Sequence, residues 1–262
     1  MYSFLKNEKK VINKIAEFIK HEIEEASSQG AVIGISGGID SAVVAYITVL
    51  AIGKDRTKLI HLPEKELNHS HTQDARLIAK QLGIELETLE ISKPINEILN
   101  ILPPLQKNKM AKGNLKARIR AILLYSIANL ENRLVIGTSN KSELIIGYGT
   151  KYGDLAADIW PIGDLYKTEI YRIAKELGID KKIIEKPPTA GLWTNQTDEG
   201  EIGISYEKLD RFLLGLENDI KEEDLINNLE ISIVQIDRIK SLIKKNKHKS
   251  MMPRICKIKR NW

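Results

Sequence analysis

Hydrophobic residues recur along this chain with two different spacings, which predict alternating helices and strands. Three- and four-residue spacing predicts amphipathic helices over residues 11–23, 70–82, 115–130 and 167–177, and residues 41–50 form a further apolar helical stretch. Short apolar or alternating runs rich in β-branched residues predict strands over 31–35, 58–62, 84–89 and 134–137. Strands that alternate with helices favour a mostly parallel sheet with helices on both faces.

Beyond residue 137 the pattern becomes less regular. Stretches rich in Gly, Pro, Asp or other polar residues predict loops over 107–114, 147–163, 186–191 and 195–203. Two or three further helices are expected between residues 205 and 245. The predicted fold class is therefore α/β, a doubly wound, mostly parallel sheet with C-terminal helices. We expect a single domain spanning residues 1–262, with a basic tail from about residue 246 to 262.

Composition narrows the class of protein without identifying it. The chain has 262 residues, of which 42% are hydrophobic and 29% charged, as in an ordinary soluble globular protein. Its 40 Lys and Arg against 35 Asp and Glu give a net charge of +5, which suits anionic ligands but is too small to indicate nucleic-acid binding. The lone Cys256 excludes an intrachain disulfide and any CxxC site.

The chain shows no targeting or membrane signal. Its first eight residues turn charged at once and lack the apolar core of a secretory signal. No apolar run approaches the roughly 20 residues that a membrane-spanning helix needs. We therefore expect a cytoplasmic protein with neither a membrane nor a nucleic acid as its partner.

A glycine-rich segment follows the first predicted strand and opens the next helix. The first N–H groups of a helix and its partial positive charge favour anions at this place. Glycines let phosphate oxygens approach the backbone, and the serine hydroxyls are further donors. The segment therefore predicts a phosphate-binding loop made of Gly34, Ile35, Ser36, Gly37, Gly38, Ile39, Asp40 and Ser41.

Asp40 within this loop points to a metal ion. A carboxylate beside a phosphate would repel it unless a divalent cation lay between them. The simpler alternative is a glycine-rich turn in which Asp40 or Ser41 only caps a helix. The loop is neither a Walker A motif, since no GK[ST] follows, nor the GxGxxG dinucleotide fingerprint.

Several segments together resemble one enzyme family. Residues 36–41 match the SGGxDS signature of the ATP pyrophosphatases, which split ATP between its α- and β-phosphates. Further matches are the KGNxKARxR stretch (112–120), the GT-to-E segment (137–143), the GxxTKYGD segment (147–154), Ala157-Asp158, the K-x-PTA segment (186–190) and His248-Lys249. On these motifs the chain is identified as a member of the ammonia-dependent NAD synthetases, whose fold is of the adenine nucleotide alpha hydrolase type.

The resemblance implies a ligase of NAD biosynthesis that acts in two steps. The nicotinate carboxylate of deamido-NAD attacks the α-phosphate of ATP and releases pyrophosphate, and ammonia then displaces AMP to give NAD. ATP is the co-substrate and Mg²⁺ the cofactor. Because the synthetase motifs begin by residue 34, we expect no glutamine-hydrolysing domain, and free ammonia as the nitrogen donor.

The same resemblance assigns roles to individual residues. It implies that the catalytic residues are Asp40 and Lys167, and that Mg²⁺ is held by Asp40 and Glu143. It implies that ATP is bound by residues 34–41 together with Thr138, Lys167 and Thr189. From the residues alone, four of these side chains also have simpler interpretations. They are a helix-terminal acid for Glu143, a helix cap for Thr138, an exposed first-turn lysine for Lys167 and a turn residue for Thr189.

Five residues match deamido-NAD contacts of the family: Arg118, Lys151, Asp158, His248 and Lys249. Arg120 is the alternative to Arg118. Side chains two positions apart on a helix do not share a face, so only one of the two arginines is expected to contact the substrate. The basic stretch that contains His248 could also be no more than a solvated chain end.

The sequence also departs from the family pattern at two positions. His61 stands where bacterial relatives often carry an arginine, and Asn140 replaces a histidine. The roles of those two family residues therefore do not transfer to this chain.

The family's homodimer is likewise implied by resemblance. A plausible interface element is the helix over 115–130, although its apolar side could equally face the sheet: Ile119, Ile122, Leu123, Ser126 and Ile127. Rival functions are another ATP pyrophosphatase, such as a GMP synthetase-like or tRNA-modifying enzyme, and a non-enzymatic RNA-binding module. The TKYGD segment, the single cysteine and the 5% aromatic content argue against them.

Overall fold

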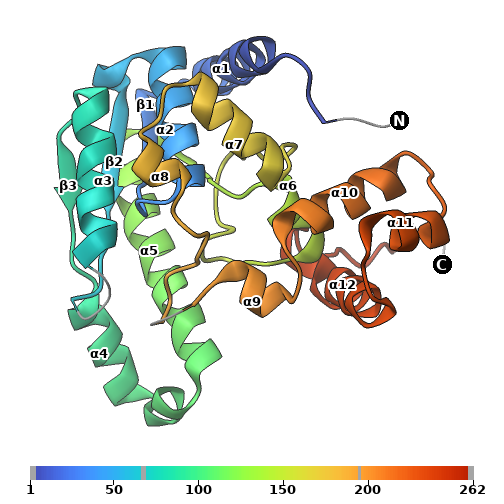
Figure 1. Ribbon diagram of the computed structural model, residues 1–262. Helices are drawn as coiled ribbons and strands as arrows, with labels where there is room; N and C mark the ends of the chain where they lie inside the picture. The colour runs from blue at the N-terminus through green and yellow to red at the C-terminus, as the bar shows by residue number, and fades with distance from the viewer. Residues whose placement is uncertain (1–3, 66–68, 194–195, 259–262) are drawn as a thin grey trace.

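A computed structural model describes residues 4–65, 69–193 and 196–258 (Figure 1). Its centre is a four-stranded parallel sheet in the order β3-β2-β1-β4. The strands are β1 (Gly30–Gly34), β2 (Thr57–His61), β3 (Leu86–Thr88) and β4 (Arg133–Ile136). All four lie within or beside the predicted segments, and the parallel α/β class is confirmed.

Helices cover both faces of this sheet because side chains alternate along its central strands. Ala31 and Ile33 face the larger core, which is closed by α1 (Glu8–Glu25), α2 (Ile39–Ile52), α3 (His69–Leu82), α7 (Lys167–Glu176) and α8 (Lys181–Ile184). Val32 faces the opposite core, closed by α4 (Ser92–Ile101) and α5 (Lys109–Glu131). Continuous apolar strands are what burial on both faces requires.

The predicted loop over 107–114 is wrong for most of its length, because α5 begins at Lys109. Asn108 caps the helix, and its side chain accepts a hydrogen bond from the Ala111 N–H at 3.0 Å. Gly113 lies within the helix, where a Cβ would come within 3.1 Å of the Trp193 ring. Close packing against a distant segment thus explains a glycine that looks like a helix breaker in the sequence.

Two short helices also form where the sequence predicts irregular structure. One is α6 (Lys141–Ile146), where Asn140 and Glu143 form a reciprocal capping box. The other is α9 (Asp198–Ile202), within the predicted loop over 195–203. Neither helix is long enough to show a clear hydrophobic period. Short 3₁₀ turns occur at Lys54–Arg56, Pro103–Lys107 and Lys247–Lys249.

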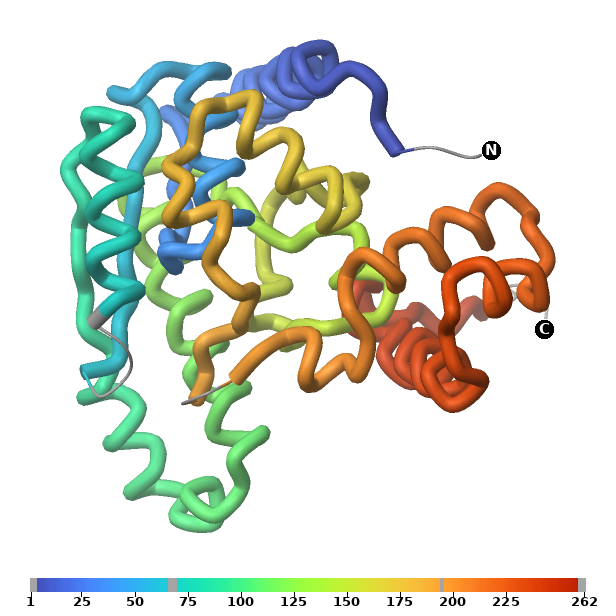
Figure 2. The backbone as a smooth tube through the Cα atoms, in the orientation of Figure 1, coloured from blue at the N-terminus to red at the C-terminus, as the bar shows by residue number. Residues whose placement is uncertain are grey.

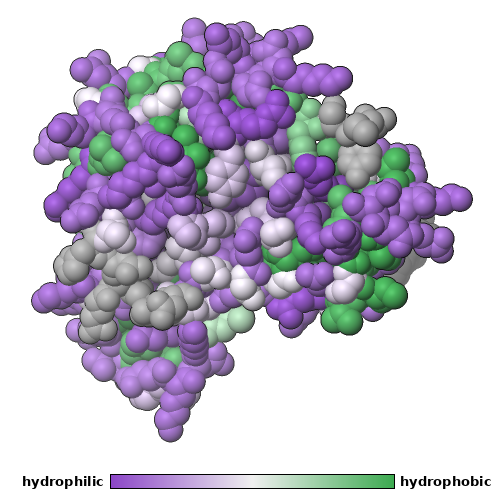
Figure 3. All heavy atoms as spheres, viewed as in Figure 1, coloured by the Kyte–Doolittle hydropathy of each residue, from purple (hydrophilic) through white to green (hydrophobic). Residues whose placement is uncertain are grey.

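The C-terminal helices build a second hydrophobic core beside the sheet (Figures 1 and 2). They are α10 (Tyr206–Glu217), α11 (Glu222–Leu229) and α12 (Ile233–Asn246), which confirms the helices expected in this region. Ile146 of α6 and Tyr166, just before α7, are part of the same core. Polar side chains cover much of the molecule in Figure 3, whereas apolar patches reach the surface over these C-terminal helices.

A buried carboxylate ties the second core to the first turns of α6 and α7. Asp210 of α10 is fully buried and accepts hydrogen bonds from the Ser142 hydroxyl at 2.5 Å and from the Thr168 N–H at 2.8 Å. Ser142 Oγ in turn accepts from the Lys167 N–H at 2.9 Å. The orientation of these two helix ends is therefore fixed by a residue of the C-terminal helices.

Among the helices in the described part of the chain, none combines the length and apolar character needed to cross a membrane.

Candidate active site

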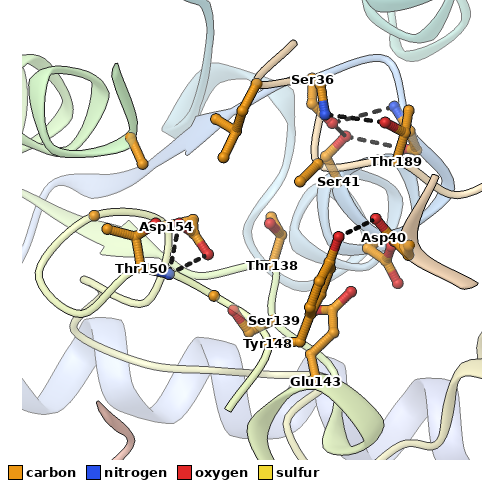
Figure 4. A pocket seen from close by; sticks show the side chains of 18 of the residues that line it. Ser36, Asp40, Ser41, Thr138, Ser139, Glu143, Tyr148, Thr150, Asp154 and Thr189 are labelled. Atoms are coloured by element: carbon orange, nitrogen blue, oxygen red, sulfur yellow. Dashed lines mark hydrogen bonds between the residues drawn. The ribbon is translucent and has the colours of Figure 1, made fainter. Parts of the chain in front are cut away.

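A cavity of about 750 Å³ opens at the carboxyl ends of the strands. This is the edge at which open α/β sheets bind their ligands. Its walls come from the loop after β1, the segment after β4, the N-terminus of α7, residues 186–193 and parts of α9 and α12. Figure 4 shows Ser36, Asp40, Ser41, Thr138, Glu143 and Thr189 around this space.

The predicted phosphate loop lies in the wall of this cavity, with a different task for each glycine. Gly37 has φ +80° and is buried, and a Cβ there would come within 2.6 Å of the His71 carbonyl oxygen on α3. A Cβ on Gly38 would meet only Ser36 Oγ, at 3.3 Å. Gly37 therefore sets the bend and its packing, and Gly38 keeps the backbone open towards the cavity.

The two loop serines stiffen the bend from within. Ser36 Oγ accepts a hydrogen bond from the Gly38 N–H at 3.2 Å, and Ser41 Oγ donates to the Gly38 carbonyl at 2.9 Å. The two hydroxyl oxygens lie 3.2 Å apart. These internal hydrogen bonds stabilise one loop conformation, which reduces the entropic cost of binding a ligand there.

Asp40 forms the electrostatic centre of the site. One carboxylate oxygen pairs with the Lys167 ammonium group, and the other accepts a hydrogen bond from the Asn140 side chain at 3.2 Å. Lys167 is only 1% exposed. Burial of its ammonium opposes the charge, but Asp40 and Glu143 outweigh this effect and raise the pKa of Lys167. The alternative of an exposed first-turn lysine is therefore wrong.

Asn140 links Asp40 to Glu143, the other predicted metal ligand. The Asn140 side-chain oxygen accepts from the Glu143 N–H at 3.0 Å, and the Glu143 carboxylate accepts from the Asn140 N–H at 3.2 Å. Enclosure in the cavity wall and the neighbouring Asp40 carboxylate raise the pKa of Glu143 well above its usual value. Two neighbouring carboxyl groups that line one cavity are a donor set of hard oxygens that suits a divalent cation.

His61, the other departure from the family pattern, stabilises the phosphate loop. It is buried, with Nδ1 2.8 Å from the Ile35 carbonyl and Nε2 3.0 Å from the Thr72 hydroxyl. Burial lowers the pKa of His61, so the ring is neutral at pH 7. The neutral ring donates a hydrogen bond to the loop backbone and so positions the loop, but it does not carry the positive charge of an arginine.

Of the remaining ATP candidates, Thr138 and Thr189 both line the cavity. Thr189 Oγ1 accepts a hydrogen bond from the Gly191 N–H at 3.1 Å, so the hydroxyl also fixes its own turn. Thr138 follows β4, and Figure 4 shows it beside the same space as Ser41 and Asp40.

The structure separates the two arginines of α5. Arg118 is exposed, lies outside the cavity lining and donates to the Lys151 carbonyl at 3.3 Å. Arg120 lines the cavity and donates to the Leu62 carbonyl at 3.0 Å. Within one chain, Arg120 is therefore the arginine placed for a ligand in this cavity, and Arg118 faces the outside.

The other predicted substrate residues lie at the rim or outside it. Asp158 accepts from the Val135 N–H at 2.7 Å and from the Tyr125 hydroxyl at 3.3 Å, which holds the end of the sheet. Lys151 Nζ donates to the His248 carbonyl at 2.7 Å, and neither of these two residues lines the cavity. Lys249 does line it, and its ammonium donates to the Gly147 and Gly149 carbonyls at 2.9 Å each.

Sequence reasoning missed an acidic group on the far wall. Tyr148 Oη lies 3.0 Å from Asp198 Oδ1 and 2.8 Å from Glu201 Oε2. Asp198 is buried, and burial raises its pKa. The signal available was the acidic stretch 198–201, which the sequence offers only as a polar loop.

Comparison with known proteins places this geometry in a family. The family model described as NAD synthase matches residues 11–253. The chain belongs to the NAD synthase family. Family membership explains why the SGGxDS loop, the TKYGD segment and Lys167 surround one cavity, and the resemblance drawn from those motifs is confirmed.

Similar proteins cover nearly the whole chain. The NH(3)-dependent NAD(+) synthetase of Methanocaldococcus jannaschii is 47% identical over 249 residues, which are 93% of this chain and 95% of that protein. The solved NH3-dependent NAD synthetase of Campylobacter jejuni is 35% identical, with a TM-score of 0.80 over 97% of this chain and 100% of that one. The predicted fold of the adenine nucleotide alpha hydrolase type is confirmed by such neighbours.

A second solved structure carries a different name. The NMN synthetase of Francisella tularensis is 32% identical, with a TM-score of 0.85 over 97% of this chain and 100% of that one. The fold is thus shared by enzymes named for two different products. None of these comparisons favours the GMP synthetase-like or tRNA-modifying alternatives.

Proposed function

We propose that this chain amidates deamido-NAD with free ammonia, using ATP and releasing AMP and pyrophosphate. The observation that carries the proposal is the ion pair between the buried Lys167 and Asp40, beside the SGGxDS loop, in a chain of the NAD synthase family. A carboxylate is a poor acyl donor, so it must first be activated as an adenylate. The site's main tasks are then to orient two polyanions and to offset their charge.

ATP would lie along the phosphate loop, with its phosphates against Gly38 and the first turn of α2. Thr138 and Thr189 line the same space and would contact the nucleotide. The Lys167 ammonium, held by Asp40, would stabilise charge that develops on the phosphates during adenylation. No proton has to move in this first step, because the attacking nicotinate group is already ionised.

Asp40 and Glu143 would hold Mg²⁺, which would supply positive charge to the phosphates. The residues fit the ion: each offers carboxylate oxygens at the cavity wall, and Asn140 orients both. Each Asp40 oxygen accepts one hydrogen bond and keeps a further lone pair for a ligand.

Deamido-NAD would occupy the part of the cavity lined by Arg120 and Lys249. Lys151, His248, Asp158 and Arg118 would contribute at or beyond its rim. The exposed Arg118 is consistent with a homodimer in which a second chain completes the site. Ile122 and Leu130 of α5 are 63% and 85% exposed, and such a dimer would cover these two apolar side chains. We place the enzyme in the cytoplasm, where its substrates are made.

The proposed reaction is tested by incubating the protein with ATP, Mg²⁺, deamido-NAD and ammonium. We expect NAD, AMP and pyrophosphate in equal amounts, measured by chromatography. A parallel reaction contains nicotinate mononucleotide in place of deamido-NAD and is expected to be much slower. Release of ADP would refute the chemistry, and a faster reaction with the mononucleotide would assign the chain the activity named for the Francisella neighbour.

Two glycine variants separate loop packing from ligand access. Gly37→Ala is expected to lower the free energy of unfolding by about 1–3 kcal/mol, because alanine is strained at φ +80°. Gly38→Ala keeps a negative φ, and its methyl group would meet only Ser36 Oγ, at 3.3 Å, which a small shift of the serine side chain relieves. The free energy of unfolding should therefore fall by less than about 1 kcal/mol. That methyl group narrows the approach to the loop, so its KM for ATP is expected to rise by roughly 10-fold or more.

Urea denaturation and initial rates measure the two effects. A reversed pattern, with Gly38→Ala the less stable variant and Gly37→Ala the weaker ATP binder, would contradict the division of tasks between the two glycines.

A further inference from the structure

A charged cluster outside the assigned residues touches the back of the phosphate loop. The ammonium group of Lys186 lies 2.7 Å from Asp74 Oδ2, 3.1 Å from His71 Nδ1 and 3.4 Å from the Gly37 carbonyl oxygen. Asp74 and His71 belong to α3, whereas Lys186 opens the segment that leads to Thr189. The cluster therefore joins three separate segments at the loop.

Asp74 is paired with two lysines. Its carboxylate is 2% exposed and lies 2.8 Å from Lys182 as well as 2.7 Å from Lys186. Burial disfavours the charged carboxylate, but hydrogen bonds from Lys182 and Lys186 outweigh burial and lower the pKa of Asp74. Because Lys182 remains as a partner, Lys186 can turn towards an anion in the cavity without leaving a buried carboxylate unpaired.

The two lysines differ in what they face. Lys186 is 18% exposed and lines the cavity, whereas Lys182 is 58% exposed and lies outside the lining. His71 accepts from Lys186 at Nδ1, so this nitrogen carries no proton, and burial lowers the pKa of His71. With a neutral histidine, one carboxylate and two ammonium groups, the cluster keeps a net charge of +1 beside the loop.

This net positive charge lies beside the phosphate loop, where ATP would bring negative charge. Among the described lysines and arginines that line the cavity, Lys167 is paired with Asp40, and Arg120, Arg238 and Lys249 donate to carbonyls away from the loop. Lys245 lies in the last turn of α12, on a different wall from the loop. Lys186 contacts the phosphate-loop backbone itself, at Gly37. ATP brings about four negative charges to this loop, and the carboxylates of Asp40 and Glu143 add to them.

We propose that Lys186 binds the departing pyrophosphate, the β- and γ-phosphates of ATP. The inference rests on the proposed function and adds a residue to it. In the adenylation step a nicotinate oxygen forms a bond to the α-phosphorus, and the bond from that phosphorus to the bridging oxygen breaks. The electron pair stays on the bridging oxygen, and the Lys186 ammonium stabilises the charge that develops on the leaving group.

The segment that follows Lys186 connects this lysine to another part of the cavity wall. Pro187 and Pro188 restrict the backbone, and the Pro188 carbonyl accepts from the Asp198 N–H at 3.1 Å. Thr189 and Asp198 both line the cavity. A lysine bound to pyrophosphate would therefore also hold this wall against the phosphate loop.

The test compares Lys186→Met with Lys182→Met, which removes the other lysine from the same carboxylate. For Lys186→Met we expect kcat to fall by about 100-fold or more. We also expect pyrophosphate to inhibit about 10-fold more weakly, with inhibition by AMP unchanged. Lys182→Met should lose clearly less in kcat and in pyrophosphate inhibition than Lys186→Met, because the ammonium group that faces the cavity is still present, and its inhibition by AMP should be unchanged. Lys186→Arg should recover most of the pyrophosphate inhibition, since arginine keeps the charge.

Thermal melting of each variant identifies any loss of fold. The proposal is overturned if Lys186→Met keeps wild-type inhibition by pyrophosphate, or if AMP and pyrophosphate inhibition weaken equally. The proposed function fails separately, if the wild-type protein makes no NAD. In that case calorimetry with pyrophosphate alone still decides: 10-fold weaker binding by Lys186→Met supports the assignment, and equal binding refutes it.

Discussion

Replacing Asp40 with asparagine is expected to reduce kcat for NAD formation by about 1,000-fold. Asparagine keeps the shape of the side chain but removes its charge, and with it the ion pair to Lys167 and one of the two carboxylates proposed to hold Mg²⁺. Both losses act on charge stabilisation in the adenylation step, so release of pyrophosphate should fall in parallel with NAD. Initial rates at saturating ATP and deamido-NAD, over a range of Mg²⁺ concentrations, measure the effect.

The same substitution carries a cost in stability that the sequence does not reveal. Lys167 is 1% exposed, and Asp40→Asn leaves its charge without its direct partner. Breaking such a pair costs about 3–5 kcal/mol, so assays must be run well below the melting temperature of the variant. A useful comparison is Asn140→Ala, which leaves the Asp40 carboxylate in place but removes its neutral contact and the side-chain cap of α6. A folded Asp40→Asn protein with near-wild-type rates at limiting Mg²⁺ would exclude Asp40 from the metal site.

A double substitution is expected to separate stability from catalysis at this pair. Lys167→Met alone should reduce kcat by about 100-fold or more, because the cation beside the phosphates is gone. It should also lower the free energy of unfolding, since Asp40 then faces Glu143 without a compensating charge. Combining it with Asp40→Asn removes both charges, and the double variant should return to within about 1 kcal/mol of wild-type stability.

The double variant should nevertheless stay inactive. Chemical denaturation and the NAD assay on all four proteins of the cycle provide the measurement. Additive stability losses would show that the two side chains do not interact in the folded protein. Recovered turnover in the double variant would show that neither charge takes part in the reaction.

Much of this site could be predicted from local sequence, for identifiable reasons. The strand before Gly34 is a run of apolar residues, which predicts a buried strand. The loop after it combines glycines, serines and an aspartate at the start of a helix, a combination typical of a phosphate-binding loop. The start of α5 could not be found in the same way, because its first turns are polar and its Gly113 packs against Trp193 about 80 residues further on. The choice between Arg118 and Arg120 likewise depends on which side of α5 faces the cavity.

Contacts between distant segments explain the remaining omissions. Lys186 and Asp74 are 112 residues apart, and neither position carries a local pattern that announces a partner. Asn140 stands where the family carries a histidine. Its side chain both caps α6 and donates a hydrogen bond to Asp40. Such roles follow from tertiary packing, and periodicity contains no information on them.

The hydrogen bonds of Asp210 hold two cavity-lining side chains indirectly, which has a consequence for how the enzyme loses activity. Glu143 and Lys167 sit next to Ser142 and Thr168, whose positions are dictated from the C-terminal helices. Partial melting of those helices would let both groups drift while the sheet stayed intact. We therefore expect activity to be lost when the C-terminal helices melt, at a temperature below the unfolding of the sheet.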